Sequence, residues 1–256
     1  MPRLRFVLGG VQKAGTTALA RYLARHPDLL LPAVKEAHVF DSPDFDDGAT
    51  AEAVDARFEA HFKGLALAPC RGDATPITVF DPRFIERVWR YSPELRWVLL
   101  LREPVARAVS QWAMERARGT ERLPLWAALL AEPFRRGRHR DDWSWESPLR
   151  WSSYAARSDY APQLQALRRR FPAEQILLLR SEALAADPEG TVQSVWRFLG
   201  LPPGPGGLDY PRVFEGEYAR PSHWSPASLW LRWRLRDARR RWRRGGGLEA
   251  WTDGWD

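Results

Sequence analysis

The stretch LGGVQKAGTTAL at residues 8–19 holds glycines, one lysine and two threonines between two apolar segments. A glycine-rich turn between a strand and a helix presents backbone N–H groups at the positive end of the helix dipole. Lys13 adds a mobile cation, and the hydroxyls of Thr16 and Thr17 add donors. Because phosphate groups accept such donors, the stretch predicts a loop that binds a terminal phosphate.

The order of residues in this loop differs from that of the common nucleotide-binding loop. That loop reads G-x-x-x-x-G-K-[ST], and its Ser or Thr binds magnesium. Here Lys13 precedes the last glycine, Gly15, and two threonines follow. A P-loop nucleotide kinase is an alternative function, but it requires the Gly-Lys order and an acidic magnesium ligand after a strand. The observed order argues against it.

Strand and helix patterns alternate along the chain. Apolar runs at 3–8, 96–101 and 175–179 predict strands. Helical patterns are expected at 17–25 (with Thr16 as its cap), 51–62, 82–91, 104–116, 160–171, 188–199 and 225–244. Residues 117–153 are rich in Arg, Trp and Pro and predict loop and short helix.

Alternating elements favour an α/β three-layer fold with a central, mainly parallel sheet flanked by helices. We expect one domain over 1–256, with 117–153 as an insertion and 225–256 as a basic helix and tail.

Several motifs resemble one enzyme family. Gly10 to Leu19, GVQKAGTTAL, is similar to the first loop of sulfotransferases of the heparan-sulfate group. The segment KEAHVFD at 35–41 and the strand-helix segment LLLREPVARAVS at 99–110 match two further signatures. The resemblance extends from about residue 3 to residue 202. It implies a P-loop-like fold and a sulfotransferase that uses 3′-phosphoadenosine 5′-phosphosulfate (PAPS), releases PAP and needs no metal.

The resemblance also assigns residues to the donor. Lys13, Ala14, Gly15, Thr16 and Thr17 would hold the 5′-phosphosulfate, and Lys13 would stabilise charge on the leaving phosphate. Arg102, at the end of a predicted strand, would hold the 3′-phosphate together with Ser110. A late segment, EYARPSH at 217–223, would close over the donor through Tyr218 and Arg220.

Glu36 is the expected general base, because an acceptor hydroxyl must lose its proton as the sulfuryl group arrives. His38 is the rival base, as in the small-molecule branch of the family. Lys35 either pairs with Glu36 or contacts the acceptor or donor.

Trp143, Trp145 and the arginines of residues 117–153 would suit a flat or anionic acceptor, and packing in the core is the alternative for the tryptophans. One position departs from the resembled group, which carries a lysine where this chain has Ala74. The departure argues against a polyanionic glycosaminoglycan. We therefore expect the acceptor to be a hydroxyl of a small molecule or sugar.

The composition sets further limits. The 256 residues carry a net charge of +7, and residues 231–244 alone, with eight arginines and one aspartate, also carry +7. In a second alternative function, the arginine-rich helix that contains these residues would bind nucleic acid. We favour the interpretation that this helix is amphipathic and packs on the domain. A cytoplasmic enzyme is expected, because the chain has a single cysteine and no long apolar run. A bacterial source fits the preference for Arg over Lys (36 to 3). A homodimer is left open.

Overall fold

The computed structural model describes residues 3–62, 68–211 and 225–244, the last eight of these by their backbone alone. The chain divides into two compact units. The first comprises residues 1–101 and 165–214, and the second comprises residues 102–164 and 215–256.

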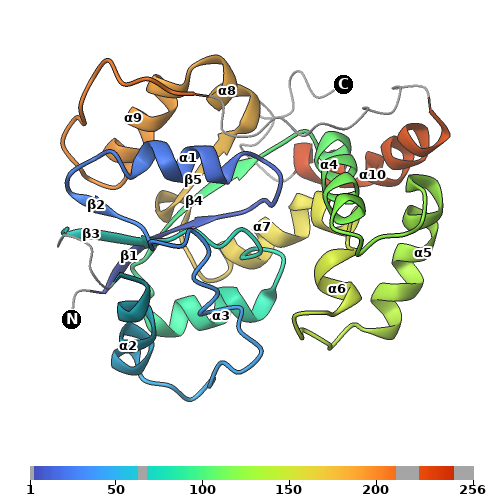
Figure 1. Cartoon of the computed structure of the whole chain (residues 1–256), viewed down its shortest axis with the longest axis horizontal. Helices are drawn as coiled ribbons and strands as arrows, with labels where there is room; N and C mark the ends of the chain where they lie inside the picture. Colours follow the sequence, from blue (N-terminus) through green and yellow to red (C-terminus); the bar gives the residue numbers. More distant parts are fainter. Residues whose placement is uncertain (1–2, 63–67, 212–224, 245–256) are drawn as a thin grey trace. The chain divides into compact units, whose positions relative to one another are not determined.

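The first unit is built on a parallel five-stranded sheet in the order β2-β3-β1-β4-β5. Its strands are β1 (Leu4–Gly9), β2 (Leu29–Leu30), β3 (Cys70–Asp73), β4 (Arg96–Leu101) and β5 (Ile176–Arg180). Its helices are α1 (Thr16–Leu23), α2 (Ala51–Phe62), α3 (Pro82–Tyr91), α8 (Ser181–Ala186) and α9 (Pro188–Phe198). In Figure 1, α1, α8 and α9 cover one face of the sheet, and α2 and α3 cover the other. The expected three-layer α/β architecture is confirmed.

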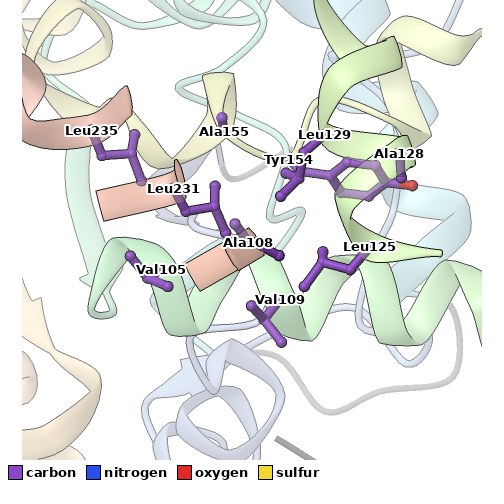
Figure 2. Close-up of a cluster of buried hydrophobic side chains, with 11 residues drawn as sticks. Val105, Ala108, Val109, Leu125, Ala128, Leu129, Tyr154, Ala155, Leu231 and Leu235 are labelled. Atoms are coloured by element: carbon purple, nitrogen blue, oxygen red, sulfur yellow. The ribbon is translucent and has the colours of Figure 1, made fainter. Parts of the chain in front are cut away.

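The second unit is helical. It contains α4 (Pro104–Ala117), α5 (Leu125–Arg138), α6 (Pro148–Trp151) and α10 (Pro226–Arg244), and α7 (Tyr160–Arg168) begins in it. Figure 2 shows its core, in which Val105 and Ala108 of α4 meet Leu129 of α5 and Leu231 of α10. The expectation that the arginine-rich helix packs its apolar face on the domain is therefore confirmed for residues 226–236.

Two local expectations are wrong. Thr16 does not cap α1, because Gly15 is the N-cap and Thr16 is already helical. The region 117–153 holds a helix of 14 residues, α5, despite Pro133 in its interior. Leu125, Ala128 and Leu129 of α5 are buried in the core of the second unit, and this packing outweighs the cost of Pro133 within the helix.

The loop after β1 is hydrogen-bonded to β4 and closely approached by the segment that follows β3. Val11 N–H donates to the Leu100 carbonyl at 2.7 Å, and Leu100 N–H donates to the Gly10 carbonyl at 3.0 Å. On the other side, a Cβ added to Gly9 would lie 2.3 Å from Thr78 Oγ1, in the segment that follows β3. The carboxyl ends of β1, β3 and β4 thus lie at one edge, where parallel α/β sheets bind ligands.

Candidate active site

The loop at residues 10–15 ends in an uncapped helix N-terminus. Gly15, the N-cap of α1, has φ 98° and ψ 17° and supplies no side-chain cap, and the first turn of α1 contains no acidic residue. Lys13 also has a positive φ, 74°. The N–H groups of the first turn have no partner within the helix, so they are oriented to bind an anion. Gly15 is needed because residues with a Cβ rarely adopt its backbone conformation.

The segment after β2 forms a chain of alternating charges. Lys35 Nζ donates to Glu36 Oε1 at 3.0 Å, and Glu36 Oε2 lies 3.4 Å from His38 Nε2. His38 Nδ1 lies 2.9 Å from Oδ2 of the fully buried Asp41. The pairing expected between Lys35 and Glu36 is present. The Glu36 carboxylate is thus held between two cationic groups.

These contacts shift the pKa values of both central groups. Burial by itself would raise the pKa of Glu36, but the hydrogen bond to His38 and the charge of Lys35 outweigh it and lower the pKa to about 2. Burial would lower the pKa of His38, but the hydrogen bonds to Asp41 and Glu36 raise it to about 9. At neutral pH the lowered pKa therefore keeps Glu36 ionised, and the raised pKa keeps His38 protonated.

Asp73, the last residue of β3, and Thr75, which follows the strand, connect this segment to the sheet. His38 N–H donates to Thr75 Oγ1 at 3.3 Å, and that hydroxyl donates to Asp73 Oδ1 at 3.0 Å. Burial, together with the nearby charge of Asp41, raises the pKa of Asp73 to about 6 against the lowering effect of the hydrogen bonds from Thr75. The sequence reasoning did not assign Asp41, Asp73 or Thr75 to the site. The signal that could have identified Asp41 is its position three residues after His38.

The stability of the fold should fall at alkaline pH because of His38. The folded state raises the His38 pKa from 6.5 to about 9, so its stabilising effect is complete below pH 6.5 and is lost as the pH rises through 9. The side chain is 37% exposed, so with solvent screening we expect a loss of only about 1 kcal/mol. Urea unfolding at pH 6.5 and 9.5 measures it.

His38→Asn is the matched control, because asparagine tolerates the φ of 53° at this position and does not titrate. Its stability should lack the decline between these pH values. An equal decline in both proteins would show that another group is responsible.

In the second unit, Arg102 lies directly before α4 and Ser110 lies within it. Glu103 caps α4 by accepting from Val105 N–H at 3.0 Å and Ala106 N–H at 2.6 Å. The Tyr160 hydroxyl donates to the Arg102 carbonyl at 2.8 Å and fixes the backbone there. Arg102 is half-buried, whereas Ser110 is buried. Both predicted 3′-phosphate ligands thus belong to one compact unit.

Of the predicted acceptor residues, Trp145 is 48% exposed and Trp143 is half-buried. The guanidinium of Arg150 stacks on the Trp145 ring at 4.4 Å and donates to the Trp143 carbonyl at 3.2 Å. Neither indole is packed in the core. Tyr218 and Arg220 lie outside the described residues.

Among the described residues, no group of three or more His, Cys, Asp or Glu side chains is arranged to hold a metal ion. No helix in that part of the chain combines the length and the apolar character needed to cross a bilayer.

Residues 4–210 match the family model described as the sulfotransferase domain. The mouse protein heparan sulfate glucosamine 3-O-sulfotransferase 6 is 32% identical over 196 residues, which are 75% of this chain and 51% of that protein. Mouse heparan sulfate glucosamine 3-O-sulfotransferase 3B1 is 29% identical over 206 residues, 76% of this chain and 45% of that protein. This chain thus spans about half the length of these curated relatives.

A solved sulfotransferase from Alicyclobacillus acidocaldarius superposes with a TM-score of 0.75 at 27% identity, covering 98% of this chain and 99% of that one. The sulfotransferase domain of the curacin biosynthetic pathway shares the fold, with a TM-score of 0.51 at 15% identity over 79% of this chain and 75% of that one. The family match includes the loop at residues 10–15, the charged segment at 35–41 and the start of α4. The chain therefore belongs to the sulfotransferase family and is a transferase enzyme.

Proposed function

We propose that this enzyme transfers the sulfuryl group of PAPS to a hydroxyl of a small-molecule or sugar acceptor. The observation that carries the proposal is the Glu36 carboxylate, which Lys35 and His38 keep ionised at the same sheet edge as an uncapped, acid-free helix N-terminus. Named relatives act on a heparan sulfate sugar, which supports a sugar hydroxyl as the acceptor class.

The residues of the first loop fit the 5′-phosphosulfate of the donor. The N–H groups of Gly15, Thr16 and Thr17 and the Lys13 ammonium would bind it, because the first turn of α1 contains no carboxylate that would repel it. Bound PAPS supplies the sulfuryl group. Lys13 stabilises the negative charge that develops on the leaving phosphate, and Glu36 accepts the proton of the acceptor hydroxyl.

The two compact units are proposed to form one catalytic domain. The family match begins in the first unit, continues through residues 102–164 and returns to the first unit. Trp143 and Trp145, which follow α5, would then contact the acceptor. Ala74, which is fully buried after β3, supplies no cation at the place where the resembled group has a lysine. An acceptor with fewer anionic groups than a glycosaminoglycan follows from this difference.

Calorimetric titration with PAP in the absence of metal tests the donor site. Wild type should bind PAP more tightly than AMP, which lacks the 3′-phosphate. Arg102→Ala should weaken PAP binding by about 10- to 100-fold, the value of a lost charged hydrogen bond, and leave AMP binding unchanged.

Arg102→Lys is the matched control for Arg102→Ala. A change at Glu103 would be a poorer control, because that carboxylate caps α4 and has no part in the proposed phosphate contact. Partial PAP binding by Arg102→Lys would separate loss of charge from loss of the planar fork. Binding of ATP with magnesium in place of PAP would contradict the proposal and favour a kinase.

A further inference from the structure

A stripe of large apolar side chains lies exposed along α5. Trp126 is 60% exposed, Leu130 is 60% exposed and Phe134 is 70% exposed. Their spacing of four residues places them on one face of the helix, over a length of about 12 Å. The opposite face of α5, with Leu125, Ala128 and Leu129, is buried in the core of the second unit. The stripe is therefore not needed for packing.

The helix α10 in the same unit repeats this pattern. Leu229 is 45% exposed and Trp233 is 62% exposed, again four residues apart. Leu231 and Leu235 on the other side of α10 are buried in the same cluster as α5. Five large apolar side chains are thus exposed on two helices that contact each other within one unit. Exposed apolar side chains in such numbers are typical of a binding surface.

The charge around these side chains is positive. Of the three arginines that end α5, Arg135 is paired with the buried Glu121, whereas Arg138 is exposed. Its one acidic residue, Glu132, is buried and accepts hydrogen bonds from the N–H groups of Ala155 and Ala156 at 2.8 and 2.9 Å. Residues 226–236 of α10 contain three arginines and no acidic residue. The exposed carboxylates that follow α5 are Asp141 and Glu146.

We propose that α5 and α10 dock this enzyme on the surface of an anionic lipid bilayer. Trp, Leu and Phe side chains would enter the boundary between headgroups and acyl chains, and the arginines would bind lipid phosphates. A second copy of the chain fits less well, because a symmetric interface would bring this arginine-rich surface against itself. No residue of this surface is assigned to the donor, and the proposal does not depend on the proposed reaction.

Sedimentation of the full chain with lipid vesicles tests the proposal. Wild type should bind vesicles of phosphatidylcholine with phosphatidylglycerol and bind phosphatidylcholine alone far more weakly, and high salt should weaken the binding. Leu130→Asp combined with Phe134→Asp should reduce the binding constant about tenfold or more. Val34→Asp is the matched control, because Val34 is 71% exposed on the first unit, and its binding should equal that of wild type.

Arg138→Glu combined with Arg234→Glu should remove the preference for anionic vesicles while the thermal unfolding midpoint stays unchanged. Both side chains are exposed. Equal binding of wild type to neutral and anionic vesicles, or no binding to either, would overturn the proposal. A wild-type dimer in analytical ultracentrifugation that Leu130→Asp with Phe134→Asp dissociates would assign the surface to a second copy.

Discussion

Glu36→Gln is expected to lower kcat by about 10²- to 10⁴-fold, the range that a general base contributes. The amide keeps the size of the side chain but cannot accept the proton of the acceptor hydroxyl. The donor contacts lie on other residues, so the affinity for PAP should change little. Steady-state kinetics with labelled PAPS and an acceptor found by screening, together with PAP titration, measure both quantities.

The pKa values predict how His38 behaves in the same assay. Its pKa of about 9 keeps it protonated at neutral pH, so we expect it to position Glu36 and not to accept a proton. His38→Asn should therefore reduce kcat less than Glu36→Gln does. The wild-type rate should show no acid limb between pH 5 and 7, because Glu36 has a pKa of about 2. Abolished turnover in His38→Asn with full activity in Glu36→Gln would make His38 the base.

Lys13→Ala is expected to lower kcat by about 10²- to 10³-fold, as the loss of one preorganised donor to a developing anion does. PAP binding should also weaken, because the helix N-terminus alone would hold the 5′-phosphate. Single-turnover rates with labelled PAPS and PAP titration separate the two effects.

Two further variants identify the cause of that loss. Lys13→Asn removes the charge but suits the positive φ of 74°, so it should lose as much activity as Lys13→Ala if the charge matters. Lys13→Arg should restore PAP binding in part and kcat only weakly, because the planar guanidinium cannot replace a compact ammonium. Turnover within about threefold of wild type in Lys13→Ala would exclude the proposed role of this lysine.

The sequence predicted the elements whose boundaries are marked by neighbouring residues. The helices α2 and α3 and the strand β4 have the expected limits. Asp81 accepts a hydrogen bond from Arg83 N–H and Pro82 starts α3, so the start of that helix is encoded within three residues. The loop at residues 10–15 and the segment 35–41 could be selected as candidate sites for the same reason, because each is a short motif.

Other features depend on contacts between distant residues. The strand β3, Cys70–Asp73, contains an arginine, a glycine and an aspartate, and its strand conformation comes from parallel pairing with β1 and β2. The helix α5 forms across Pro133 because its apolar face packs on α4 and α10.

The electrostatics of the candidate base also required the fold. The sequence placed Glu36 and His38 two residues apart and left the choice between them open. Only the folded chain brings the buried Asp41 against His38 and fixes the His38 backbone to Thr75, 37 residues away. Burial strengthens the ion pairs in this chain of charges, so the tertiary structure lowers the pKa of Glu36 and raises that of His38, and this difference favours Glu36 as the proposed base.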